Sequence, residues 1–224
     1  MEIKKLSTNS PIDKLLEGGL EFGAVTNIYG PPGSGKTNIA ISSAMCCKGK
    51  IIYIDTEGSF SLDRFRQMGG DEKKLKNIML IEPHSWQEQL VTVENLEKVF
   101  QKESIELVII DSLVALYRLE LSQENFPQIN RQLATQYSVL SRISREHKLP
   151  ILVTNQVYSQ GDEVEVSSKS IARYWSKCLI ELKRTDKDNH RLAILRKHRS
   201  LPEGRKVEFE ITQKGLKEVK FSIF

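Results

Sequence analysis

Short apolar runs alternate with amphipathic stretches along the first two thirds of the chain. The apolar runs predict strands at Ala24–Tyr29, Ile51–Asp55, Asn77–Ile81, Leu107–Asp111 and Ile151–Asn155. The stretches between them have helical spacing and predict helices at Lys36–Cys46, Ser61–Met68, Ser85–Glu103 and Ile129–His147. Nearly continuous apolar strands joined by helices are typical of a parallel sheet that is covered on both faces. The pattern therefore predicts an α/β fold with a mostly parallel central sheet.

After residue 174 the pattern changes to an alternation of apolar and polar positions. Two alternating runs, Cys178–Leu182 and Leu192–Arg196, lie on either side of a polar turn and predict antiparallel strands at the edge of the sheet. Val207–Ile211 predicts one further strand. Tyr174 and Trp175 stand where the first of these strands would begin, which suggests core or edge packing.

A glycine-rich segment joins the first predicted strand to the first predicted helix. Residues 30–37 read Gly-Pro-Pro-Gly-Ser-Gly-Lys-Thr and match the phosphate-binding pattern G-x-x-x-x-G-K-[ST] in the strand–loop–helix context that it requires. In such a loop, backbone N–H groups surround a phosphate chain at the positive end of a helix. Lys36 would reach the β- and γ-phosphates, and the Thr37 hydroxyl would ligate Mg²⁺. The predicted nucleotide-binding residues are Gly30, Pro31, Pro32, Gly33, Ser34, Gly35, Lys36 and Thr37.

Polar residues end three of the other predicted strands. Because the carboxyl ends of parallel strands face the ligand crevice, Asp111 would meet the phosphate loop there and support Mg²⁺. Either Glu57 or Asp55 would orient the water that attacks the γ-phosphate, and either also fits a solvated strand-end charge. Gln156 would hydrogen-bond the γ-phosphate through a neutral amide, or it is a plain polar strand end.

Composition narrows the class of protein without naming a partner. The 224 residues are 39% hydrophobic and 28% charged, a balance that is typical of globular proteins, and the pattern predicts one domain over residues 1–224. A formal charge of +4 permits a nucleic-acid partner without requiring one. Cys46, Cys47 and Cys178 lack metal-ligand spacing. We find no signal peptide and no membrane-spanning run in the sequence, so we expect a cytoplasmic protein.

The order of these motifs resembles the RecA/RadA recombinase family. The segments that carry the resemblance are the phosphate loop, Tyr-Ile-Asp-Thr-Glu-Gly at 53–58, Val-Ile-Ile-Asp-Ser at 108–112, Val-Thr-Asn-Gln-Val at 153–157 and Leu-Pro-Glu-Gly at 201–204. The resemblance covers residues 6–216 and implies a RecA-like P-loop NTPase core that binds ATP and Mg²⁺. Only 29 residues precede Gly30, too few for the N-terminal domain and Phe-x-x-Ala docking motif of RadA. The chain is therefore most similar to short archaeal RadA paralogues, and filament assembly through that motif is not expected.

The resemblance also implies roles for single residues. Glu57 would position the lytic water, and Gln156 would sense the γ-phosphate and pass its state to the following loop. Arg64 matches the family arginine that stacks on adenine, although a solvated helix charge fits the same position. Lys197 and Arg199 match a basic pair that RecA-like ATPases insert into the nucleotide site of a neighbouring subunit; the alternative is a basic surface turn.

The DNA-binding candidates follow from the position of the family's two DNA loops. Arg118 falls in the first, and Tyr158, Lys169 and Arg173 fall in the second, which corresponds to Val157–Arg173. Acidic residues in the second loop, and the absence of the glycine pair common in RadA, depart from the family pattern. Each basic cluster also fits an ordinary solvated face.

The resemblance implies an accessory factor of homologous recombination that binds single-stranded or branched DNA and hydrolyses ATP slowly. Implied partners are the RadA recombinase, a Holliday-junction resolvase or a DNA polymerase, together with a second copy of the chain and no membrane. Two alternatives stay open at this stage. One is a KaiC-like regulatory ATPase that acts on proteins without DNA, and the other is a nucleotide-gated scaffold that barely hydrolyses ATP.

Overall fold

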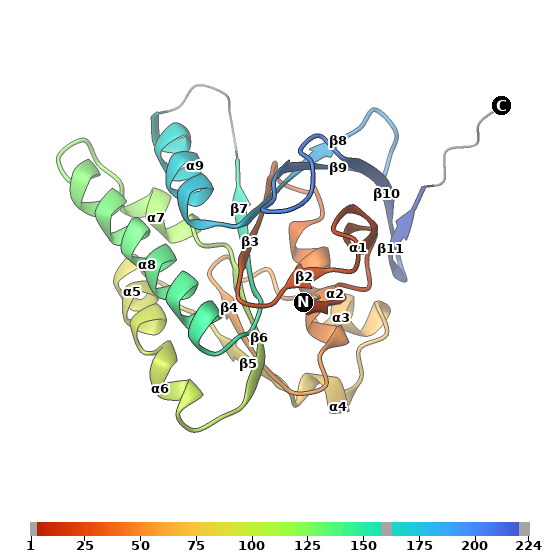
Figure 1. Cartoon of the computed structure of the whole chain (residues 1–224), viewed down its shortest axis with the longest axis horizontal. Helices are drawn as coiled ribbons and strands as arrows, with labels where there is room; N and C mark the ends of the chain where they lie inside the picture. Colours follow the sequence, from red (N-terminus) through yellow and green to blue (C-terminus); the bar gives the residue numbers. More distant parts are fainter. Residues whose placement is uncertain (1–3, 158–162, 220–224) are drawn as a thin grey trace.

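A nine-stranded sheet forms the centre of the molecule in a computed structural model that describes residues 4–157 and 163–219 (Figure 1). The strand order is β11-β10-β9-β8-β3-β7-β6-β4-β5. The strands are β3 (Val25–Gly30), β4 (Lys50–Asp55), β5 (Ile78–Ile81), β6 (Ile105–Asp111), β7 (Ile151–Gln156), β8 (Cys178–Arg184), β9 (His190–Lys197), β10 (Lys206–Thr212) and β11 (Gly215–Glu218). From β8 to β5 all pairs are parallel, whereas β9, β10 and β11 pair antiparallel. A separate ribbon joins β1 (Lys5–Leu6) to β2 (Leu20–Glu21).

Helices cover both faces of this sheet, as the apolar strands predict. One face carries α5 (Trp86–Glu94), α6 (Leu96–Phe100), α7 (Ala115–Glu120), α8 (Phe126–Glu146) and α9 (Glu163–Trp175), and the other carries α1 (Ile12–Leu15), α2 (Lys36–Cys46), α3 (Leu62–Gln67) and α4 (Glu72–Leu75) (Figure 1). Alternate strand residues enter two separate cores: Ile52 and Ile110 pack toward α5 and α8, whereas Tyr53 and Ile109 pack toward α2. Burial on both faces explains why these strands are almost wholly apolar.

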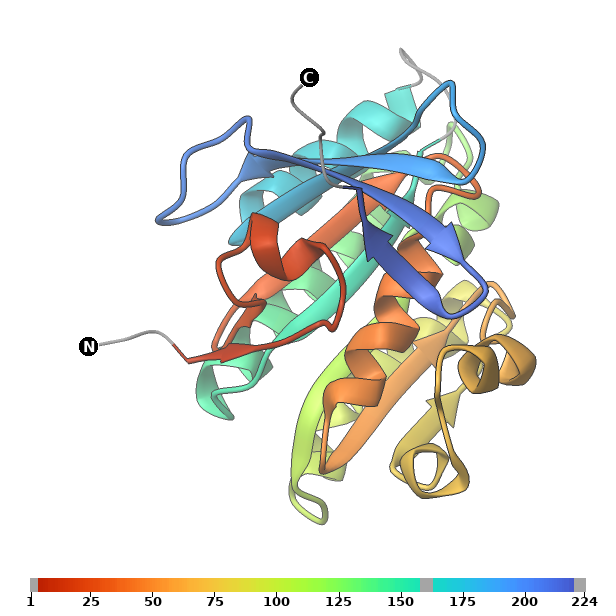
Figure 2. The same ribbon diagram turned by 90° about the vertical axis from the view of Figure 1, so that its right-hand side faces the viewer.

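The C-terminal strands follow the prediction with one refinement. β8 and β9 pair antiparallel, as the alternating pattern predicts. However, β8 itself joins β3 in parallel, so the antiparallel part of the sheet begins only at β9. Helix α9 is the crossover between β7 and β8, which lie on either side of β3 and both run parallel to it. Figure 2 shows β10 and β11 beside α2, where the phosphate loop ends.

The structure corrects three predictions, for one helix, one loop and one strand start. The helix predicted over Ser85–Glu103 is divided at Asn95 into α5 and α6. Its predicted start is confirmed, since the Ser85 hydroxyl accepts a hydrogen bond from Glu88 N. The described part of the segment expected to be a DNA loop is helical from residue 163 onward. Tyr174 and Trp175 end that helix and do not begin a strand, and Tyr174 is exposed.

Candidate functional site

The phosphate loop connects β3 to α2 and needs glycine at several positions. Gly33 and Gly35 have φ angles of +69° and +100°, in the left-handed region that side chains disfavour. A Cβ atom on Gly30 would lie 2.5 Å from the carbonyl oxygen of Leu182 in β8, which is too close for any side chain. The loop is therefore held tightly against the C-terminal strands, with its turn open on the other side.

Lys36 bridges the two ends of this loop. Its ammonium group donates to the carbonyl oxygens of Gly30 at 2.9 Å and Pro31 at 3.1 Å. Because an ammonium group has three donors, one stays available for a ligand. Burial lowers the pKa of Lys36, while the carboxylates of Glu57 and Asp111 raise it. A buried cation inside a glycine loop fits a phosphate chain.

Asp111 ends β6 and is 2% exposed. Its carboxylate accepts hydrogen bonds from Tyr53 Oη at 3.0 Å, from Ser59 Oγ at 3.1 Å and from the Thr154 hydroxyl. Burial and the adjacent Asp111 hold the pKa of Tyr53 well above its usual value, so this phenol stays a donor. The carboxylate is thus fixed in place by hydroxyl groups.

The two predicted metal ligands, Thr37 and Asp111, are brought together through Ser59. The Ser59 hydroxyl lies 3.5 Å from Thr37 Oγ1 and 3.1 Å from Asp111 Oδ2. The described residues contain no group of three His, Cys, Asp or Glu side chains able to hold a metal by themselves. This suits Mg²⁺, which takes one or two protein ligands together with phosphate oxygens. Sequence reasoning missed Ser59, which no motif marks.

Asp55 and Glu57 have different environments in the structure. Asp55 is 2% exposed, and its two oxygens accept hydrogen bonds from the backbone N–H groups of Phe60 at 2.7 Å and Glu57 at 3.1 Å. Glu57 is exposed, and its Oε1 accepts a hydrogen bond from Ser112 Oγ at 2.7 Å, the one that it makes among the described residues. Asp55 is thus occupied in shaping the turn after β4, whereas Glu57 faces the crevice with an oxygen available. Ser112 was also missed from sequence, although it follows Asp111 directly.

Gln156 lies between the phosphate loop and α9. It ends β7 in register with Gly30, and the next residue, Val157, donates its N–H to Gly30 O at 3.2 Å. Gln156 also lines a cavity of about 260 Å³ that Lys169 and Arg173 of α9 line as well. It therefore lies near both of the regions that the sequence expects it to link, and the coupling itself stays a prediction.

Arg64 has defined partners and is not a freely solvated charge. Its Nε donates to Asn38 Oδ1 of α2 at 2.6 Å, and its Nη1 donates to the carbonyl oxygen of Gln213 at 2.9 Å. Gln213 lies in the turn between β10 and β11. Arg64 thus ties α3 to α2 and to the β10–β11 turn, and its stacking on adenine stays a prediction.

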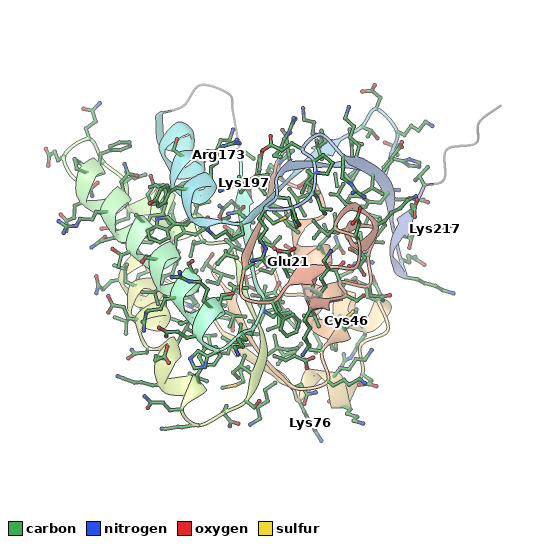
Figure 3. The ribbon with its side chains drawn as sticks, in the orientation of Figure 1. Glu21, Cys46, Lys76, Arg173, Lys197 and Lys217 are labelled. Atoms are coloured by element: carbon green, nitrogen blue, oxygen red, sulfur yellow. The ribbon has the colours of Figure 1, made fainter. Side chains whose placement is uncertain are left out.

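Lys197 and Arg199 lie at the opposite end of the sheet from the phosphate loop. β9 runs antiparallel to β8, so its last residue, Lys197, pairs with Leu179 near the start of β8. The Lys197 ammonium group donates to the carbonyl oxygen of Arg173, and Figure 3 shows the two residues beside each other. Arg199 Nε lies 2.5 Å from Glu21 Oε2. Neither side chain contacts the phosphate loop of its own chain, so a role at the nucleotide site of a neighbouring subunit stays a prediction, with a basic surface turn as the alternative.

The DNA-binding candidates come from separate elements. Arg118 lies on α7, whereas Lys169 and Arg173 lie on α9, and the two helices cover the same face of the sheet (Figure 1). Arg173 Nη2 lies 3.8 Å from Glu203 Oε1. Tyr158 lies outside the described residues. The DNA-binding role of all four stays a prediction.

Comparison with known proteins finds a matching family model, similar sequences and a similar solved structure. A family model described as Rad51 matches residues 1–219. The DNA repair and recombination protein RadB of Methanosphaera stadtmanae is 41% identical over 221 residues, which cover 94% of each chain. The RadB of Methanothermobacter thermautotrophicus is 39% identical over 230 residues, which cover 96% of each chain. A crystal structure of the RadB recombinase superposes with a TM-score of 0.82 at 33% identity and covers 96% of this chain. Within the described part of the chain, no helix has both the length and the apolar character of a membrane span.

Proposed function

The chain belongs to the Rad51 family, and on that premise we propose that it is an ATP- and DNA-binding recombinase paralogue that acts as an accessory factor in homologous recombination and DNA repair. The recombination and repair role is supported by relatives that bear the name DNA repair and recombination protein RadB and match the chain almost end to end. The finer statement on the nucleotide rests on the geometry of the site, and those on DNA and protein partners rest on the family resemblance.

One observation carries the nucleotide part of the proposal. Lys36, Glu57, Asp111 and Gln156 follow four neighbouring strands, β3, β4, β6 and β7, and all lie at the carboxyl edge of the sheet. Ligands of parallel α/β sheets bind at this edge. We assign the phosphate chain to the loop over 30–37, Mg²⁺ to Thr37 with the support of Asp111, and the base to the side of Arg64.

When bound, ATP–Mg²⁺ supplies an electrophilic γ-phosphoryl group for in-line attack by water. Glu57 orients that water and accepts its proton, while Ser112 holds the carboxylate through the 2.7 Å hydrogen bond. Lys36 donates to the phosphate oxygens on which negative charge develops. Lys197 and Arg199 are turned away from this site, so we expect hydrolysis by an isolated subunit to be slow.

We propose that the nucleotide acts as a switch for DNA binding. Gln156 senses the occupied phosphate site from its position beside Gly30 and transmits the change to α9, which carries Lys169 and Arg173. DNA, single-stranded or branched, is the proposed macromolecular ligand. The RadA recombinase, a resolvase, a DNA polymerase and a second copy of this chain are the proposed protein partners, in the cytoplasm.

Binding to labelled single-stranded DNA across a salt series, with and without ATP–Mg²⁺, tests this function. Contacts to phosphates release counterions, so affinity should fall steeply with salt, and ATP should shift it. A salt-dependent binding that ignores ATP would leave a DNA-binding protein without the switch. No binding at low salt would refute the DNA-binding role and point to a regulatory ATPase with protein partners.

A further inference from the structure

Arg191 reaches the phosphate loop from the C-terminal part of the sheet. It lies at the start of β9 and is only 9% exposed. Its Nε donates to the carbonyl oxygen of Gly33 at 2.8 Å, and its Nη1 donates to the carbonyl oxygen of His190 at 2.7 Å. Residues 33 and 191 are far apart in sequence, so this contact is made by the fold and follows from no motif.

The charge of Arg191 has no acidic partner. Within residues 4–157 and 163–219, no carboxylate forms an ion pair with it; the nearest candidate on the neighbouring strand, Glu208, pairs instead with His190 at 2.8 Å. The residue opposite it on β8 is another cation, Arg184. Burial and the Arg184 charge both lower the pKa of Arg191. A buried cation that lacks a counter-charge is costly, and an anion bound nearby relieves that cost.

Apolar side chains also pack against the phosphate loop. Phe209 lies opposite Arg191 on the neighbouring strand β10. A Cβ atom on Gly35 of the loop would lie 3.5 Å from the Phe209 ring and 3.3 Å from the Ile211 side chain. The back of the loop thus rests on Arg191, Phe209 and Ile211. Phe209 and Ile211 carry no negative charge that could compensate Arg191, whereas a polyphosphate held by the loop would bring one.

We propose that Arg191 is a positioning residue of the nucleotide site: it fixes the Gly33 peptide of the phosphate loop, and its uncompensated charge is neutralised by a bound polyphosphate. This inference rests on the proposed function, because it assigns the polyphosphate to the loop over 30–37. Arg191 would then contribute to binding of the phosphate chain and not to recognition of the base.

Three variants separate this role from a structural one. Arg191→Met keeps an apolar stem and removes both the charge and the hydrogen bonds. Arg191→Lys keeps the charge and loses the planar fork that bonds Gly33. Arg184→Met is the matched control, since it removes an exposed arginine that lies directly opposite on β8. The probes are inorganic tripolyphosphate, which lacks a base, and ATP–Mg²⁺. The readouts are the dissociation constants and the thermal midpoint of the unliganded protein.

Arg191→Met is expected to weaken tripolyphosphate and ATP binding roughly tenfold or more, the effect of one charge-assisted interaction, while the unliganded midpoint stays level or rises. Arg191→Lys should fall between Arg191→Met and the wild type, and it carries the test alone if Arg191→Met does not fold. Arg184→Met should bind like the wild type. Unchanged affinity in both Arg191 variants would overturn the inference while the proposed function stands. A wild-type protein that binds neither probe would overturn both.

Discussion

The substitutions Asp55→Asn and Glu57→Gln each replace one carboxylate by its amide, yet they are predicted to impair different properties of the protein. Asp55 ends β4 and Glu57 follows two residues later, and the residue pattern without the family resemblance does not choose between them as the group that activates water. In the structure, Asp55 shapes the turn and Glu57 faces the crevice. We therefore predict a loss of stability for Asp55→Asn and a loss of turnover for Glu57→Gln.

The cost of Asp55→Asn follows from its hydrogen bonds. Phe60 N donates to one oxygen and Glu57 N to the other, at 2.7 Å and 3.1 Å. An asparagine keeps only one acceptor oxygen, so one of these N–H groups would face an NH₂ group in a nearly dry site. A hydrogen bond to a charged group contributes about 1.5–3 kcal/mol. With the remaining bond weakened as well, we expect a loss of about 2–3 kcal/mol, which lowers the melting temperature by roughly 4–12 °C.

Glu57→Gln should leave the fold almost unchanged. Its one described hydrogen bond, from Ser112 Oγ, can be kept by the amide oxygen, and exposed substitutions of this kind alter stability by about 0.5 kcal/mol or less. Loss of a positioned base reduces the rate of proton transfer about 10²–10⁴-fold. That reduction corresponds to roughly 2.7–5.5 kcal/mol in the activation barrier.

Urea unfolding and single-turnover ATP hydrolysis at saturating ATP measure the two effects on the same preparations. ATP affinity, measured separately, should stay close to wild type in Glu57→Gln. Full turnover in Glu57→Gln, or a stable Asp55→Asn protein that no longer hydrolyses ATP, would refute the assignment. The first result would exclude Glu57 as the group that acts on water, and the second would assign that role to Asp55.

Three further predictions concern the switch, the subunit contact and pH. Gln156→Ala should keep ATP affinity but abolish the effect of ATP on DNA binding; an unaltered response, measured by fluorescence anisotropy, would contradict the coupling. Mixing Arg199→Ala with Lys36→Ala subunits should restore part of the ATPase rate if the site forms across subunits, and no recovery from folded, associating proteins would indicate a surface turn. Burial raises the pKa of Cys178 in the folded protein to about 12, whereas a thiol in the unfolded chain has a pKa of about 8.5. The stability that the neutral thiol contributes is therefore fully present below a pH of about 8.5. As pH rises from there to about 12, the free energy of unfolding should fall by up to about 1.4 kcal/mol per unit, and Cys178→Ala should flatten this part of the urea-measured profile.

Long apolar runs made the parallel sheet predictable. Each of the runs that end at Asp55, Asp111 and Asn155 is buried on two faces, and no other common environment requires such a run. The phosphate loop was equally predictable, because its glycines, lysine and threonine each have a separate role in binding phosphate and Mg²⁺. Orientation was harder to predict. The alternation along β8 is the same for a parallel and an antiparallel neighbour, so only the crossover through α9 reveals that β8 pairs with β3 in parallel.

The parts of the site that sequence could not supply depend on contacts between distant segments. Ser59 joins Thr37 to Asp111, and Arg191 supports Gly33, yet neither residue belongs to a motif. Asp55 and Glu57 are chemically alike and two positions apart, so the residue pattern left both open; the family resemblance favoured Glu57, and their hydrogen bonds now give the physical difference between them. Sequence patterns indicate the local structure that each segment favours, whereas these roles follow from contacts between segments that are distant in the sequence.

Strand β9 shows why the slow hydrolysis proposed for one subunit is compatible with a complete set of catalytic groups. Arg191 near its start touches the phosphate loop, and Lys197 at its end bonds the carbonyl of Arg173. At about 3.3 Å per residue the two positions are about 20 Å apart, so one subunit cannot use both at one nucleotide. For Lys197 and Arg199 to act in catalysis, they would have to do so at the nucleotide site of a neighbouring subunit. In such an assembly β9 would connect a subunit's own phosphate loop, through Arg191, to the groups that it offers to the next nucleotide site. A nucleotide that repositions Gly33 would then act on this strand directly.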